Sequence, residues 1–111
     1  MFRHIVLTRF KPDVSEAQIA QLYDRLSALI DRHPGARGFL GGRSTSREQM
    51  ERGFLHGFTI DFDDWTALQA YADDPDHRAL SAELVESAIG GRDGLIVLDI
   101  EVPGQDDPAK P

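Results

Sequence analysis

The spacing of apolar residues changes along the chain, and the order of these changes constrains the fold more than any other feature of the sequence. Residues 2–10 alternate between two faces, which is typical of a β-strand. One face of this strand carries His4, Val6, Thr8 and Phe10. The spacing then lengthens to three and four residues, which predicts an α-helix. Its apolar positions are Ile19, Leu22, Tyr23, Leu26, Leu29 and Ile30.

Local signals mark both ends of this helix. Ser15 and Gln18 have the spacing of a capping box, in which each side chain bonds the backbone N–H of the other residue. Pro34 disfavours helical geometry in the residue before it, and Gly35 favours a turn. We therefore expect the helix to end near His33.

Three more strands and a divided helical region follow. The strands are expected at residues 36–44, 54–62 and 95–102, with a polar loop at 45–53. A helix should begin at Trp65, break at the acidic, proline-containing residues 73–76 and continue as a short second helix. The order β-α-β-β-α-β predicts an α+β, ferredoxin-like domain, in which helices cover one face of an antiparallel four-stranded sheet.

Length and composition limit the remaining possibilities. The chain has 111 residues, enough for one domain, which we place at 1–102, with a polar, proline-rich tail at 103–111 expected to be disordered. A net charge of −7 argues against nucleic acid and anionic membrane surfaces as partners, and the absence of cysteine excludes disulfides and thiolate sites. Without a signal-peptide core or a spanning apolar run, the expected location is cytoplasmic.

Both faces of the first and last strands are apolar. A sheet covered by helices on one side and by water on the other should alternate apolar with polar residues. Short apolar runs without strict patterning are one explanation; the other is a partner on the second face, for which a second copy of the chain is the economical candidate. The expected homodimer surface contains Ile5, Leu7, Ile96, Leu98 and Ile100.

The chain has four histidines and a tyrosine of chemical interest. His33 at the helix end is expected to be structural, and His4 and His56 on their strands are more typical of hydrogen-bonded core residues. The divided helix can bring Tyr71 and His77 together, so that an imidazole moves a proton while a phenol stabilises an oxyanion. No local spacing indicates a metal site, although ligands from separate strands stay open, and no nucleotide or cofactor motif is present.

Five motifs in this order resemble the stress-responsive A/B barrel domain (Dabb) family over residues 2–102. They are His4-Ile5-Val6-Leu7-x-x-Phe10-Lys11-Pro12, His33-Pro34-Gly35, His56 at the start of a strand, Tyr71-x-x-x-Pro75-x-His77 and Leu95-x-x-Leu98-Asp99-x-Glu101. The resemblance implies a ferredoxin-like domain that pairs through its sheet into a dimeric α+β barrel. It agrees with the two apolar faces of the strands.

The resemblance also implies candidate site residues. Plant polyketide cyclases of this family use a histidine and a tyrosine as acid and base without a cofactor, and these match His77 and Tyr71. The implied ligand pocket contains His4, Val6, Thr8, Tyr23, Leu26, His56, Phe58, Leu95 and Val97. Asp74 stands where the family often has histidine, and Leu26 stands where the cyclase has an aromatic residue.

Three functions are compatible with these features. The first is a non-catalytic homodimer that binds a small hydrophobic or carbonyl ligand without turnover or protects under stress. The second is a cofactor-free acid/base enzyme resembling a polyketide cyclase or lyase, for which loss of His77 should abolish turnover but not folding. The third is a cofactor-free monooxygenase of the antibiotic-biosynthesis type, which would consume oxygen with aromatic substrates.

Overall fold

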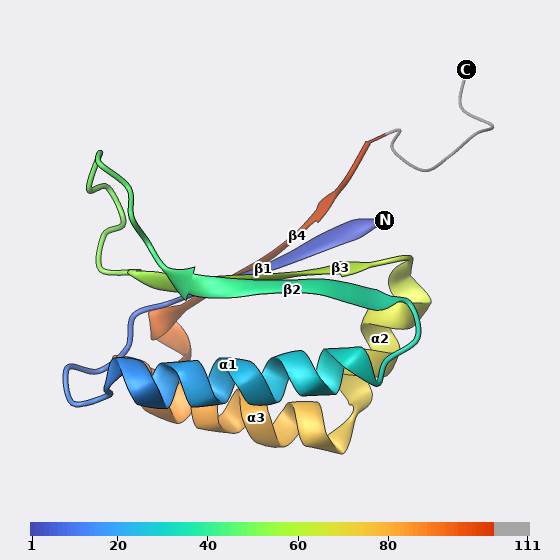
Figure 1. Cartoon of the computed structure of the whole chain (residues 1–111), viewed down its shortest axis with the longest axis horizontal. Helices are drawn as coiled ribbons and strands as arrows, with labels where there is room; N and C mark the ends of the chain where they lie inside the picture. Colours follow the sequence, from blue (N-terminus) through green and yellow to red (C-terminus); the bar gives the residue numbers. More distant parts are fainter. Residues whose placement is uncertain (104–111) are drawn as a thin grey trace.

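The computed structural model describes residues 1–103 as a four-stranded sheet with its helices on one face (Figure 1). The strands are β1 (Phe2–Thr8), β2 (Ala36–Arg43), β3 (His56–Phe62) and β4 (Leu95–Glu101), and the helices are α1 (Glu16–Asp31), α2 (Trp65–Asp73) and α3 (Pro75–Ser87). A short 3₁₀ turn at Gly91–Gly94 precedes β4. The sheet order is β2-β3-β1-β4 with every neighbouring pair antiparallel, which confirms the ferredoxin-like α+β class.

Several boundaries differ from those expected. The first strand ends at Thr8 because the backbone of Arg9 bonds the turn residue Gly94 and not a strand, while Phe10 forms an isolated bridge. The helix expected to be short, α3, runs for 13 residues. The tail expected at 103–111 lies outside the described residues from 104 onward. No helix in residues 1–103 has the length and apolarity to cross a membrane.

The capping signals work as expected at the start of α1. The Ser15 hydroxyl accepts the Gln18 backbone N–H at 3.1 Å, and the Gln18 side chain accepts the Ser15 N–H at 2.7 Å. All six apolar positions of the helix are buried. Helix α1 therefore begins where its cap dictates and turns its apolar stripe to the sheet.

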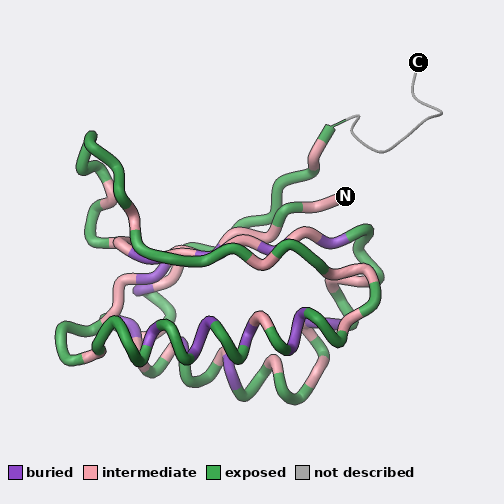
Figure 2. The backbone as a smooth tube through the Cα atoms, viewed as in Figure 1, coloured by how far each residue is buried: buried purple, intermediate pink, exposed green. Residues whose placement is uncertain are grey.

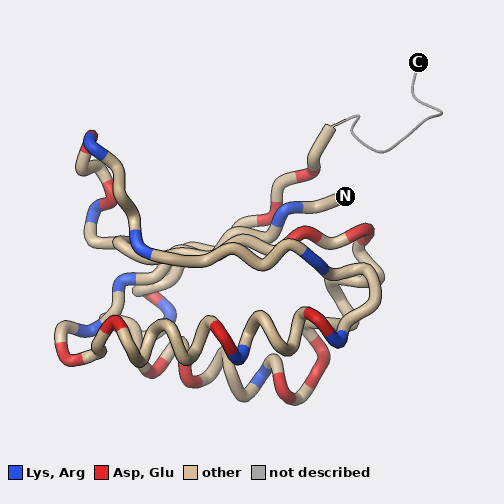
Figure 3. Tube along the Cα trace, in the orientation of Figure 1, with Lys and Arg blue, Asp and Glu red and all other residues tan. Residues whose placement is uncertain are grey.

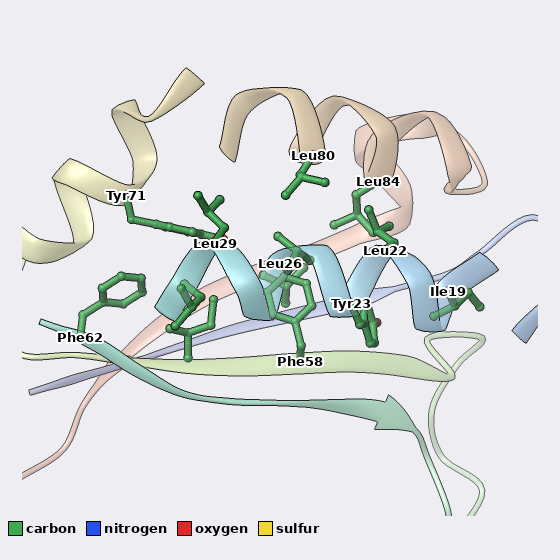
Figure 4. Close-up of a cluster of buried hydrophobic side chains, with 13 residues drawn as sticks. Ile19, Leu22, Tyr23, Leu26, Leu29, Phe58, Phe62, Tyr71, Leu80 and Leu84 are labelled. Carbon is green, nitrogen blue, oxygen red and sulfur yellow. The ribbon is translucent and has the colours of Figure 1, made fainter. Parts of the chain in front are cut away.

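The core lies between the sheet and the helix layer. In Figure 2 the buried positions of α1 recur along the helix, and those of β3 alternate with intermediate ones, so both elements have one inner side. The inner face of β3 contributes His56, Phe58, Ile60 and Phe62, all buried. Figure 4 shows the side chains of α1, α2 and α3 meeting those of β3, with Tyr71 of α2 directed toward Leu29 of α1.

Two adjacent glycines in β2 provide a matched test of this packing. A Cβ atom at Gly41 would lie 2.8 Å from the Tyr23 ring and 3.1 Å from Phe58 Cβ, whereas a Cβ at Gly42 would meet nothing within 4 Å. We expect Gly41→Ala to destabilise the fold by about 1–3 kcal/mol, because the core must move aside. Gly42→Ala should be neutral or stabilising by up to about 1 kcal/mol. Chemical denaturation of both variants measures the difference, and equal stabilities would contradict the packing described.

Candidate active site

A cavity of about 170 Å³ lies between the sheet and the helices. Its lining combines eight of the side chains expected in the pocket with five others, and most of it is apolar. The expected residues are His4, Val6, Leu26, Phe58, Tyr71, His77, Leu95 and Val97. The additional ones are Leu68, Ala72, Leu80, Ser81 and Leu84. Val97 lines the cavity and is still 55% exposed, so the cavity opens to solvent past β4.

The break between α2 and α3 brings Tyr71 and His77 together. Asp74 ends α2 and caps α3, with one carboxylate oxygen accepting the Asp76 N–H at 2.8 Å. Pro75 occupies the first position of α3, where a missing N–H costs nothing. Because the chain turns there, His77 stacks at a tilt on Tyr71, with the ring centroids 4.1 Å apart.

The surroundings shift the pKa values of His77 and Tyr71 in directions that suit a base and an acid. Burial lowers the pKa of His77, and the nearby His4 and His33 lower it further, against the opposing effect of the Ala72 carbonyl. Burial raises the pKa of Tyr71 above its usual range. At neutral pH His77 is therefore uncharged and Tyr71 keeps its proton.

The tautomer of His77 follows from its hydrogen bond. His77 Nδ1 lies 3.3 Å from the Ala72 carbonyl oxygen. A carbonyl oxygen can only accept, so Nδ1 carries the ring proton. The other ring nitrogen, Nε2, is then unprotonated and able to accept a proton.

Two further histidines, each bonded to a carboxylate, flank Tyr71. His4 Nδ1 donates to Asp99 at 2.7 Å, and His33 Nε2 donates to Asp74 at 2.7 Å. Their rings stand edge-on to Tyr71, at centroid distances of 6.3 Å for His4 and 5.9 Å for His33. Within residues 1–103, no three His, Asp or Glu side chains gather with metal-ligand geometry.

Sequence reasoning missed part of this arrangement. The sequence predicts His33 only as a structural residue at a helix end, whereas the structure places its ring beside Tyr71. Asp74 and Asp99 stood within the motifs, but not as histidine partners. The presence of Asp74 and Asp99 inside these motifs is the signal from which histidine partners could have been proposed.

Thr8, Tyr23 and His56 do not line this cavity, although the family resemblance implies a pocket that contains them. His56 lies at the opposite end of the sheet from His4, where its Nε2 donates to both oxygens of Glu16 at 3.0 Å. Tyr23 packs against Phe58, with its hydroxyl buried and unpaired among the described residues. The Thr8 side chain is fully buried. At this end Glu16 of α1 binds His56, and Tyr23 of α1 packs on β3.

The lowered pKa of His77 makes stability depend on pH. Below about pH 6.5, the ordinary histidine value, the unfolded chain takes up a proton that the folded site resists, so unfolding becomes more favourable. We expect the free energy of unfolding to fall more steeply from pH 7 to pH 5 in the wild type than in His77→Gln. Denaturant titrations across this range measure the two slopes; parallel slopes would contradict the shift. Asp74 and Glu16 have lowered pKa values, so their contribution to stability is lost only at more acidic pH.

A ferredoxin-like domain with a tyrosine and a histidine paired in a cavity between sheet and helices defines a class of small α+β proteins. Within that class, this chain belongs to the stress-responsive A/B barrel domain family, whose model matches residues 2–102.

Relatives and solved structures agree with this assignment. A stress-response A/B barrel domain-containing protein, HS1 of Arabidopsis thaliana, is 27% identical over 97 residues, covering 87% of this chain and 85% of the relative. Olivetolic acid cyclase of Cannabis sativa is 23% identical over 75 residues, covering 68% of this chain and 74% of the cyclase. A dimeric ferredoxin-like protein from Jannaschia sp. CCS1 superposes with a TM-score of 0.85 at 32% identity, covering 91% of this chain and 98% of its own.

Proposed function

We propose that the protein is a homodimeric, cofactor-free enzyme that moves a proton at the carbon next to a carbonyl group in a small apolar compound. The observation that carries this proposal is the contact between His77 and Tyr71 at the cavity, with a lowered pKa on the imidazole and a raised pKa on the phenol. Opposite shifts on two adjacent groups separate a base from a hydrogen-bond donor. The name of one relative, a cyclase, supports chemistry at a carbonyl compound.

The proposed reaction uses only groups of this chain. His77 Nε2 removes the proton from the carbon adjacent to the carbonyl, and the electron pair of the broken C–H bond moves onto the carbonyl oxygen. The Tyr71 hydroxyl donates a hydrogen bond to that oxygen as it becomes negative. The resulting enolate carbon either takes the proton back from His77 or attacks a second carbonyl, and in the latter case His77 returns the proton to the new alkoxide.

The cavity limits the size of the substrate. A cavity of roughly 150 Å³ holds a molecule the size of benzene, so about 170 Å³ accommodates one ring or a short acyl chain. Leu26, Phe58 and Leu80 supply an apolar wall. A longer substrate would extend past Val97 into solvent. The proposed substrate is therefore a carbonyl compound with a small apolar part.

The homodimer is proposed on the outer face of the sheet. Leu40 on β2 is 72% exposed, and Ile96, Leu98 and Ile100 on β4 are 40%, 39% and 48% exposed. The charged residues of the strands lie near the strand ends, which leaves the middle of the sheet uncharged (Figure 3). The similar protein from Jannaschia is described as dimeric. A second copy of this apolar face would cover the first.

The test is hydrogen–deuterium exchange on small ketones and β-keto thioesters in D₂O, followed by NMR of the substrate. Enzyme-dependent deuterium at the carbon next to the carbonyl is the expected result. Binding to the cavity without exchange would replace the proposal with a non-catalytic binding role. Oxygen consumption with aromatic quinols, in the absence of exchange, would favour the monooxygenase alternative.

A further inference from the structure

We propose that His33 and Asp74 form a positioning pair that holds His77 against Tyr71. Neither residue lines the cavity, so the pair acts through the residues that do. This inference rests on the proposed function, because it assigns a role to the pair in the same acid/base site.

The Asp74 carboxylate joins two parts of the fold that are distant in sequence. One oxygen accepts the Asp76 N–H at the start of α3, and the other accepts His33 Nε2 beyond the end of α1. Both side chains are largely shielded, with 14% of His33 and 22% of Asp74 exposed. A charge-assisted hydrogen bond of 2.7 Å in such surroundings resists exchange with water.

The position of this bond explains its influence on the site. Tyr71 lies in the last turn of α2, and His77 is the third residue of α3, so the geometry at Asp74 sets how the two rings meet. His33 also places its own ring edge-on to Tyr71. The His33 ring thus restrains the Tyr71 phenol, and the Asp74 carboxylate restrains the start of α3.

A neighbouring interaction provides a control. Arg32 and Asp76 also link the end of α1 to the start of α3, at 3.2 Å, but both side chains are about two-thirds exposed. Exposed pairs of this kind contribute little, because water screens them. If any contact between the end of α1 and the start of α3 were sufficient to hold His77 against Tyr71, Arg32→Ala and the loss of the His33 bond would disturb the two rings equally.

The experiment is NMR of the full chain with labelled histidine and tyrosine. In His33→Phe, which keeps an aromatic ring but cannot donate, we expect the His77–Tyr71 ring NOE to fall by at least half. The pKa of His77 should also rise, because the loosened junction admits water and because the lowering effect of the His33 imidazole is lost. His33→Gln, whose amide can still donate to Asp74, and Arg32→Ala should retain the wild-type NOE.

Asp74→Asn is the second variant, for use if His33→Phe does not fold. Asparagine caps a helix as well as aspartate, so this variant weakens the bond to His33 and keeps α3. It should lower the NOE in the same way as His33→Phe. A wild-type NOE in the folded His33→Phe or Asp74→Asn protein would overturn the proposal.

The same NMR measurements separate this inference from the proposed function. They require no turnover, so a protein that exchanges no substrate can still show the positioning effect. Where exchange is measurable, His33→Phe should lower kcat about tenfold at unchanged KM, since the pair does not touch the ligand.

Discussion

His77→Gln should lower the exchange rate at least 100-fold while the protein stays folded and dimeric. General-base catalysis contributes about 10²–10⁴-fold, and glutamine cannot take up the proton. The loss should appear in kcat, because the imidazole acts on the transition state and contributes little to holding the ligand. Steady-state exchange kinetics, with circular dichroism to verify folding, measure the effect.

His56→Gln is the matched control, since it makes the same chemical change outside the cavity lining. Its amide can still bond Glu16, and exchange should remain within threefold of the wild type. Tyr71→Phe should lose about 10²–10³-fold, the usual effect of removing one oxyanion donor. Full activity in His77→Gln would refute the assignment of His77 as the base. Equal losses of exchange rate in His56→Gln and His77→Gln would show that the reaction does not take place in this cavity.

Leu98→Asp should convert the proposed dimer into monomers. Leu98 lies on the outer face of the sheet, directly opposite Ile5 in the β1–β4 register. In a symmetric dimer the change would bury two carboxylates without partners, and an uncompensated buried charge costs about 3–5 kcal/mol. At about 1.4 kcal/mol per factor of ten, we expect the dissociation constant to rise by at least 100-fold.

Sedimentation velocity over a range of protein concentrations measures this change. Gln21→Glu is the control, because it adds one negative charge at an exposed position of α1, on the helix layer. It should leave the association unchanged. A wild-type monomer, or a Leu98→Asp dimer as tight as the wild type, would contradict the proposed interface.

Much of the fold was predictable because its signals are local. The capping box of Ser15 and Gln18 and the alternation of β3 depend on residues a few positions apart, and both appear as expected. Strand ends were less predictable. Thr8 ends β1 because Arg9 bonds Gly94, a residue of a distant turn.

The candidate site was only partly predictable, because its geometry also depends on contacts between residues that are distant in sequence. Alternation places Thr8, His56 and Phe58 on the inner face with Val6, but it does not distinguish a position under a helix from one beside a cavity. That difference depends on where α1 rests along the strands. Phe58 lines the cavity, while His56 meets Glu16 of α1.

The sequence by itself determined the order of elements and the inner faces of β1 and β3, and it indicated that a broken helix can bring Tyr71 and His77 together, because each follows from spacing along a few residues. Only the tertiary structure decided the partners of the other histidines. The bonds from His4 to Asp99 and from His33 to Asp74 join residues 95 and 41 positions apart. Such contacts arise when whole elements pack together, and no local period encodes them.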